Sequence, residues 1–205
     1  NKNYVVAIFD DPKFASRNMT IQQKRKEITE FFTRFKYFGP IIYGNSVNEV
    51  LDKALEHDVD YCIVQAVGHI VREGSFFKII EKWMDKKNFF VTGHIMDKET
   101  PNSNWAEGNG YYGLHKQCIL VNLKYYEKFD KPVWGEAKHK IDKPEHLAAA
   151  NRHVKDIHDD YTPLALMPTE ETKVCTPLVD GWNFINTSLE NGLTVYNFHP
   201  KVRDA

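Results

Sequence analysis

The sequence predicts an α/β fold: a mostly parallel open sheet with helices on both faces, followed by an irregular C-terminal region. Two observations carry this prediction. Short apolar runs alternate with amphipathic helical segments through the first half of the chain, and this pattern changes after Asp97. Parallel neighbouring strands need long crossover connections, and helices that serve as crossovers cover both faces of the sheet.

Four short apolar runs predict the strands of this sheet, at residues 4–9, 41–43, 61–67 and 89–92. Three helices are expected between them. Thr20 and Gln23 match a capping box, in which two side chains three positions apart bond to each other's backbone N–H, and Ser46 and Glu49 match it more closely. Apolar residues follow each box at helical spacing, and the third helix is expected from Ser75 to about residue 87.

The second half of the chain has a weaker pattern. Residues 98–110 are polar and rich in Gly and Asn, which predicts a surface loop and a candidate lid. We expect residues 1–130 to form the core and residues 131–205 to form an extension that packs on the same domain. The elements expected after the loop are a strand at 117–123, helices at 123–129, 144–157 and 181–190, and a last strand at 193–198.

Composition argues against several classes of function. The net charge is -1 and no basic block occurs, so a nucleic-acid partner is not expected. No apolar run approaches the roughly 20 residues of a membrane span. The three cysteines, at positions 62, 118 and 175, are widely spaced, and two of them lie in apolar strand-like runs where buried thiols are expected. A disulfide framework is not expected, which favours a reducing compartment and a cytoplasmic protein. The chain starts without Met, which is compatible with a domain of a longer protein.

The loop after the first strand lacks a glycine-rich phosphate motif. Its sequence is Asp10-Asp11-Pro12-Lys13, and neither G-x-G-x-x-G nor a Walker motif occurs anywhere in the chain. A dinucleotide-dependent dehydrogenase and a P-loop enzyme are therefore disfavoured.

Two of the predicted strands are followed by Gly-His, at Gly68-His69 and Gly93-His94. Ligands bind at the carboxyl edge of open α/β sheets, and neutral imidazole binds metals or acts as a base near neutral pH. The two histidines therefore predict a pocket at this edge. The alternative is that each histidine only caps a turn.

A polar and aromatic segment follows the start of the candidate lid. Trp105, Tyr112, His115 and Gln117 combine ring faces with hydrogen-bonding groups, which suits stacking on a sugar ring. An aromatic corner that packs on the core is an equally good interpretation.

The densest cluster of metal-ligating residue types is His158-Asp159-Asp160. His158 and Asp160 predict a metal site, and His199, near Arg203, could complete the facial triad of a non-haem iron oxygenase with them. The jelly-roll strands that such an oxygenase needs are not evident in the sequence. The third interpretation is a solvated loop.

The segment DYCIVQAVGHIVREGSFFKIIEKWMDKKNFFVTGHIMD, preceded by a strand and two further strand–helix units, resembles the nucleotide-sugar half of a GT-A glycosyltransferase, which is Rossmann-like. The segment YYGLHKQCILVNLKYYEKF is similar to a later part of that family, which shapes the acceptor pocket. The resemblance covers residues 4–130 and is one of pattern. Where the family has an acidic D-x-D motif, this chain has Gln65-Ala66-Val67-Gly68-His69.

The resemblance implies a glycosyltransferase that moves a sugar from a nucleotide-sugar to a hydroxyl acceptor, with Mn²⁺ or Mg²⁺ at the diphosphate. Because the D-x-D motif is absent, three alternatives stay open. His69 and the His158–Asp160 cluster could be substitute ligands, the transferase could be metal-independent, or the chain could be a non-catalytic interaction domain. The implied roles are catalysis by His69, Asp159 and Asp160, and substrate binding by Asp10, Asp11, Gln65, His94, Trp105, Tyr112, His115 and Gln117.

Overall fold

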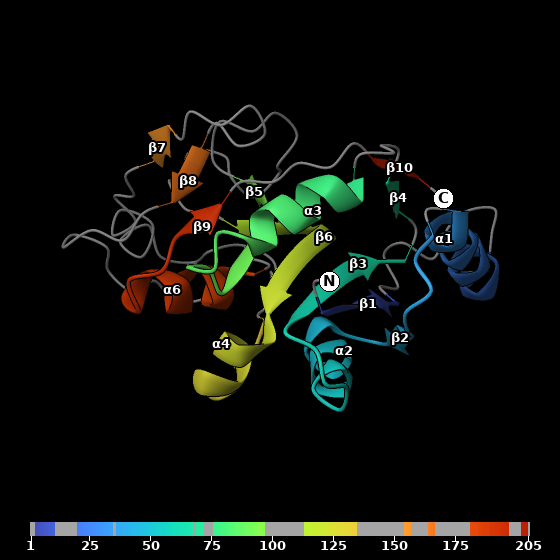
Figure 1. Ribbon diagram of the computed structural model, residues 1–205, viewed down its shortest axis with the longest axis horizontal. Helices are drawn as coiled ribbons and strands as arrows, with labels where there is room; N and C mark the ends of the chain where they lie inside the picture. Colours follow the sequence, from blue (N-terminus) through green and yellow to red (C-terminus); the bar gives the residue numbers. More distant parts are fainter. Residues whose placement is uncertain are drawn as a thin grey trace, which may run out of the picture. The chain divides into compact units, whose positions relative to one another are not determined.

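A computed structural model describes most of the first half of the chain and several shorter segments of the second half (Figure 1). The chain forms two compact units. The first comprises Asn1–Lys87, Lys116–Lys124 and Pro200–Ala205, and the second comprises Asn88–His115 and Tyr125–His199. The predicted boundary at residue 130 stays a prediction. The described residues are 3–10, 20–34, 36–67, 69–71, 76–96, 113–134, 154–156, 164–166, 181–196 and 202–204.

The main sheet has five strands in the order β2-β1-β3-β6-β5. β1 pairs in parallel with both β2 and β3, whereas β6 pairs antiparallel with β3. The α/β class is therefore confirmed, but the sheet is mixed and its parallel part is the β2-β1-β3 segment. The strands are β1 (Tyr4–Phe9), β2 (Ile41–Gly44), β3 (Tyr61–Ala66), β5 (Val91–Met96) and β6 (Gly113–Asn122).

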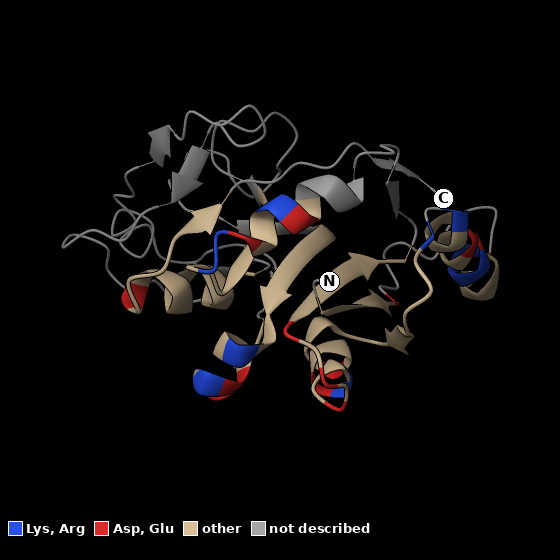
Figure 2. Ribbon diagram, in the orientation of Figure 1, with Lys and Arg blue, Asp and Glu red and all other residues tan. Residues whose placement is uncertain are grey.

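The parallel segment forms because its strands are apolar along their whole length. β1 reads YVVAIF and β3 reads YCIVQA, and only the first residue of each is less than fully buried. Val6 pairs with Ile41 on one side and with Ile63 on the other. These strands contain no charged residue, as Figure 2 shows, and such continuous apolar runs are typical of parallel strands covered on both faces.

The predicted capping boxes set the starts of two helices in the first unit. Thr20 and Gln23 bond reciprocally: the Thr20 amide donates to Gln23 Oε1 at 2.7 Å, and the Gln23 amide donates to Thr20 Oγ1 at 3.2 Å. Helix α1 (Ile21–Arg34) follows. Ser46 caps α2 (Val47–Ala54), which packs against β1, β2 and β3. The third predicted helix is confirmed as α3 (Phe76–Met84).

The second unit has an aromatic core around α6 (Trp182–Glu190), at the place where a helix was predicted. The Phe184 ring lies 4.8 Å from the Phe90 ring and 5.1 Å from the Trp134 ring, measured between centroids. Gly181 precedes the helix with a φ of 73°, and a Cβ there would lie 2.7 Å from the Trp134 ring. Glycine is therefore required at this position by backbone conformation and by space.

The remaining elements confirm some predictions and correct one. Helix α4 (Leu123–Lys128) and strand β9 (Val195–Tyr196) lie where a helix and a strand were expected. The helix predicted at 144–157 is wrong at its end, because Val154–Asp156 forms strand β7 and pairs antiparallel with β8 (Leu164–Leu166). No helix among the described residues has the length and apolar character needed to span a membrane.

Candidate functional site

The candidate site lies at the carboxyl edge of the parallel strands in the first unit. β1 lies between β2 and β3. The chain therefore places its second strand on one side of β1 and its third strand on the other side. Open α/β sheets bind ligands outside the strand ends at the position where the strand order reverses in this way. Asp10 directly follows β1, and its amide donates to the Gly44 carbonyl at 2.8 Å. Asp10 is therefore fixed at the point where this topology places a ligand.

Asp10 forms an ion pair with Arg25 of α1. Arg25 Nε donates to Asp10 Oδ1 at 3.1 Å, and Arg25 Nη2 donates to Asp10 Oδ2. The Asp10 side chain is only 11% exposed and the Arg25 side chain 33% exposed. A bidentate pair with this degree of burial has a fixed geometry and is only partly screened by solvent.

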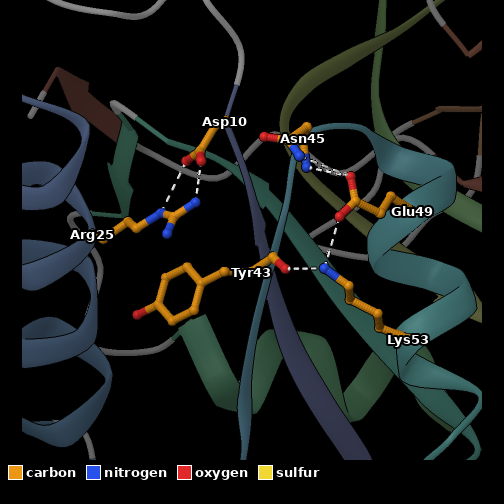
Figure 3. A network of polar contacts seen from close by, with 6 residues as sticks. All are labelled: Asp10, Arg25, Tyr43, Asn45, Glu49 and Lys53. Atoms are coloured by element: carbon orange, nitrogen blue, oxygen red, sulfur yellow. Dashed lines mark hydrogen bonds and ion pairs between the residues drawn. The ribbon is translucent and has the colours of Figure 1, made fainter.

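The ring of Tyr43, on β2, lies against the face of the Arg25 guanidinium. The Arg25 guanidinium carbon lies 4.7 Å from the centroid of the Tyr43 ring, and the Tyr43 hydroxyl forms a hydrogen bond with Thr29 Oγ1 on α1. Figure 3 shows the guanidinium between the Asp10 carboxylate and the Tyr43 ring. The contact adds a cation–π attraction and limits the rotation of the guanidinium.

A second acid–base pair lies beside the first, at the N-terminus of α2 (Figure 3). Glu49 accepts from the Asn45 amide at 2.8 Å and from Lys53 Nζ at 2.7 Å. Lys53 also donates to the Tyr43 carbonyl at 2.8 Å. The hydrogen bond from Lys53, followed by the bond from the Asn45 backbone, lowers the pKa of Glu49 below its usual value.

This second pair bears on where an anion can bind. Helix N-termini attract anions through their free backbone N–H groups. At the start of α2, however, Ser46 Oγ accepts from the Glu49 amide and the Glu49 carboxylate accepts from the Asn45 amide, and Glu49 adds a negative charge. Thr20 and Gln23 likewise serve the first turn of α1. Neither helix start offers the open amide groups that bind phosphate in a P-loop, in agreement with the missing motif.

The predicted Gly-His positions need a correction. His94 lies inside β5 rather than after a strand, because the strand begins at Val91 and continues to Met96. His69 does not end β3 either; it begins the short strand β4 (His69–Val71), which pairs antiparallel with β10 (Val202–Asp204). His69 belongs to the first unit and His94 to the second. Their predicted roles in a pocket stay predictions.

The other predicted site residues fall into two groups. Gln65 is fully buried within β3, and His115 and Gln117 lie on β6. Arg203, considered beside His199, lies on β10. The roles of these residues stay predictions. The remaining candidates lie outside the described residues: Asp11, Trp105, Tyr112, His158, Asp159, Asp160 and His199.

Within the described part of the chain, no group of three or more His, Cys, Asp or Glu side chains could hold a metal ion. Cys62 and Cys118 are buried and not in a disulfide. Burial raises the pKa of both thiols, to about 12 for Cys118. Both are therefore protonated near neutral pH and unreactive, as expected for cysteines that act as small core residues.

Arg25 and Tyr43 were not identified from the sequence. Arg25 is one of several basic residues on α1, and only the tertiary contact with Asp10 distinguishes it from Lys26 or Arg34. The sequence feature that could have pointed to Arg25 is the aspartate directly after β1. A carboxylate that is poorly exposed to solvent needs a cationic partner from a neighbouring element.

Comparisons with known proteins add little to this picture. No protein-family model matches the chain, and no curated protein matches it. Among solved structures, the chain is similar to mannose-6-phosphate isomerase from Helicobacter pylori, with 9% sequence identity and a TM-score of 0.43, over 98% of this chain and 100% of that chain. A similarity at this level carries no argument about fold or function.

Proposed function

We propose that the chain binds a nucleotide-sugar at the carboxyl edge of β1, β2 and β3 and transfers the sugar to a hydroxyl acceptor. The observation that carries this proposal is the position of Asp10 where the strand order reverses. The class of ligand comes from the resemblance to GT-A glycosyltransferases over residues 4–130. Mn²⁺ or Mg²⁺ at the diphosphate belongs to the same proposal.

The geometry of Asp10 suits a hydroxyl-rich ligand. Each carboxylate oxygen accepts one N–H from Arg25, and each oxygen has a second acceptor position. A ribose or sugar hydroxyl can donate to these positions. Arg25 neutralises the carboxylate, so an anionic ligand meets less repulsion at this edge than it would at an unpaired aspartate.

The chemistry requires a base and a leaving group. The acceptor oxygen forms a bond to the anomeric carbon, the bond from that carbon to the diphosphate oxygen breaks, and the base takes the acceptor proton. The nucleoside diphosphate leaves with the electron pair. His69, Asp159 and Asp160 are the candidates for this base, and His158 with Asp160 for a metal site.

Isothermal titration calorimetry with a panel of nucleotide-sugars, with and without Mn²⁺, tests the proposal. We expect saturable binding of at least one donor. Asp10→Asn should weaken that binding about tenfold through loss of one charge-assisted hydrogen bond.

Asp58→Asn is the matched control, because Asp58 is an exposed residue just before β3, at the amino edge of the sheet. It should leave donor binding unchanged. Failure of every donor to bind the wild-type protein would exclude the proposed function.

A further inference from the structure

Arg25 has a second donor edge that Asp10 does not use. A guanidinium carries five N–H groups in a rigid plane. Arg25 Nε and one N–H of Nη2 point at Asp10. The remaining edge is formed by Nη1 and the second N–H of Nη2, and Arg25 makes no further hydrogen bond among the residues that the structure describes. One third of the side chain is exposed.

The structure also holds this edge in one orientation. Asp10 binds one edge of the guanidinium, and the Tyr43 ring lies against its face (Figure 3). The Tyr43 hydroxyl is held in turn by a hydrogen bond with Thr29. A free arginine side chain loses considerable rotamer entropy when it binds a ligand. Arg25 has already lost most of this freedom through folding, so a ligand at its second edge orders little more.

We propose that this second edge of Arg25 is a binding site for an oxyanion, either a phosphate or a carboxylate. Its two parallel N–H groups match two oxygen atoms of such a group. Lys53, another cation described close to this strand edge, already donates to Glu49 and to the Tyr43 carbonyl. At the starts of α1 and α2, backbone amides already donate hydrogen bonds to nearby side-chain oxygens. Within the described part of this strand edge, Arg25 therefore keeps a donor edge that an anion can occupy.

The charges around Arg25 set the expected strength. The anion contacts the guanidinium directly, whereas the Asp10 carboxylate binds the other edge of the same guanidinium and opposes binding from a greater distance. Glu49 adds a second, more exposed negative charge nearby. Attraction at contact exceeds repulsion at longer range, and the net effect is modest. A dissociation constant on the order of 1 mM is expected for a simple inorganic anion.

The inference does not rest on the nucleotide-sugar proposal, because the probes are simple anions. NMR spectra of the arginine Nε–H groups are recorded while sodium phosphate or sodium acetate replaces sodium chloride at constant ionic strength. The Arg25 signal should shift and saturate, while the Arg34 signal should not. Saturation by either anion supports the site, and the tighter anion identifies its ligand class. Absence of a saturable Arg25 shift with both anions would overturn the inference.

Two lysine variants test whether anion binding needs the planar, paired N–H groups of the guanidinium. Arg25→Lys keeps the charge but not the second donor edge, and it should weaken anion binding at least about fivefold. Arg34→Lys is the matched control on the same helix, where Arg34 has only an exposed pair with Glu30 at 3.9 Å. It should change binding less than about twofold. Unchanged binding by a folded Arg25→Lys variant contradicts the inference, and the wild-type titration decides the question if that variant does not fold.

The two proposals can fail independently. A wild-type protein that binds phosphate at Arg25 but binds no nucleotide-sugar contradicts only the proposed function. A protein that binds a donor while its Arg25 signal stays unchanged with phosphate and acetate contradicts only the oxyanion site.

Discussion

Two acid–base pairs lie at neighbouring strand ends in the first unit, and they differ in burial and in their part in the fold. Asp10 and Arg25 have side chains 11% and 33% exposed, and they join β1 to α1. Glu49 and Lys53 are 36% and 43% exposed and lie one turn apart on α2. The first pair is a long-range contact that water screens weakly, while the second is a local contact that water screens strongly. The same kinds of charge thus support tertiary structure in one place and a helix start in the other.

The largest effect is expected from Asp10→Ala. It removes two charge-assisted hydrogen bonds and leaves Arg25 partly buried without its partner, which should lower the free energy of unfolding by about 2 kcal/mol. Urea unfolding measures this as a lower midpoint with an unchanged slope. Asp58→Ala, at an exposed position, is the control and should have an effect within about 0.5 kcal/mol. Equal losses in the two variants would mean that the partly buried Asp10–Arg25 pair contributes no more to stability than an exposed aspartate does.

A smaller effect is expected from Tyr43→Leu. This change removes the ring that lies against Arg25 while it keeps an apolar side chain, so it should lower the free energy of unfolding by about 0.5–1 kcal/mol. Tyr43→Phe separates the ring from the hydroxyl, which bonds to Thr29. If Tyr43→Phe costs as much as Tyr43→Leu, the hydroxyl rather than the cation–π contact stabilises this corner.

The smallest effect is expected from Glu49→Gln, and it should depend on pH. The pKa of Glu49 in the folded protein is lowered below its unfolded value of 4.5. Its stabilisation is therefore fully present above pH 4.5 and is lost as the pH falls through the lower, folded pKa. The melting temperature of the variant should be lower than that of the wild type at pH 7, and the two should converge below pH 4.5. A difference that stays constant down to pH 3 would show that charge is not its cause.

Local features were predictable from the sequence because neighbouring residues determine them. Thr20 and Gln23 were expected to cap a helix and do so through two reciprocal bonds. Ser46 also caps its helix, but Glu49 bonds to the Asn45 amide in place of the expected Ser46 amide. The apolar run at residues 61–67 likewise became a buried strand.

Non-local features were predicted less well. A strand was expected at 117–123, where β6 lies, but the sequence pattern did not indicate that β6 joins the sheet beside β3 in the antiparallel direction. The Gly-His dipeptides were interpreted as strand ends, but Gly93-His94 lies within β5. A short apolar run does not mark where a strand stops, because backbone pairing can continue through glycine and histidine when a partner strand is present.

The site shows the same division. Asp10 was recognisable as a polar residue directly after an apolar strand, which is a local pattern. Its partner Arg25 lies 15 positions further along the chain. No periodicity links the two residues, and the contact exists only because folding brings Arg25 of α1 beside the residue that follows β1.

The sequence by itself determined the α/β class, the buried parallel strands and the helix starts, since each depends on residues within one turn or one strand. The tertiary structure alone decided the strand order, the mixed character of the sheet and the choice of Arg25 as the partner of Asp10. The physical reason is range. Capping and apolar periodicity act over a few residues, whereas strand pairing and ion pairing depend on segments that meet only after the chain has folded.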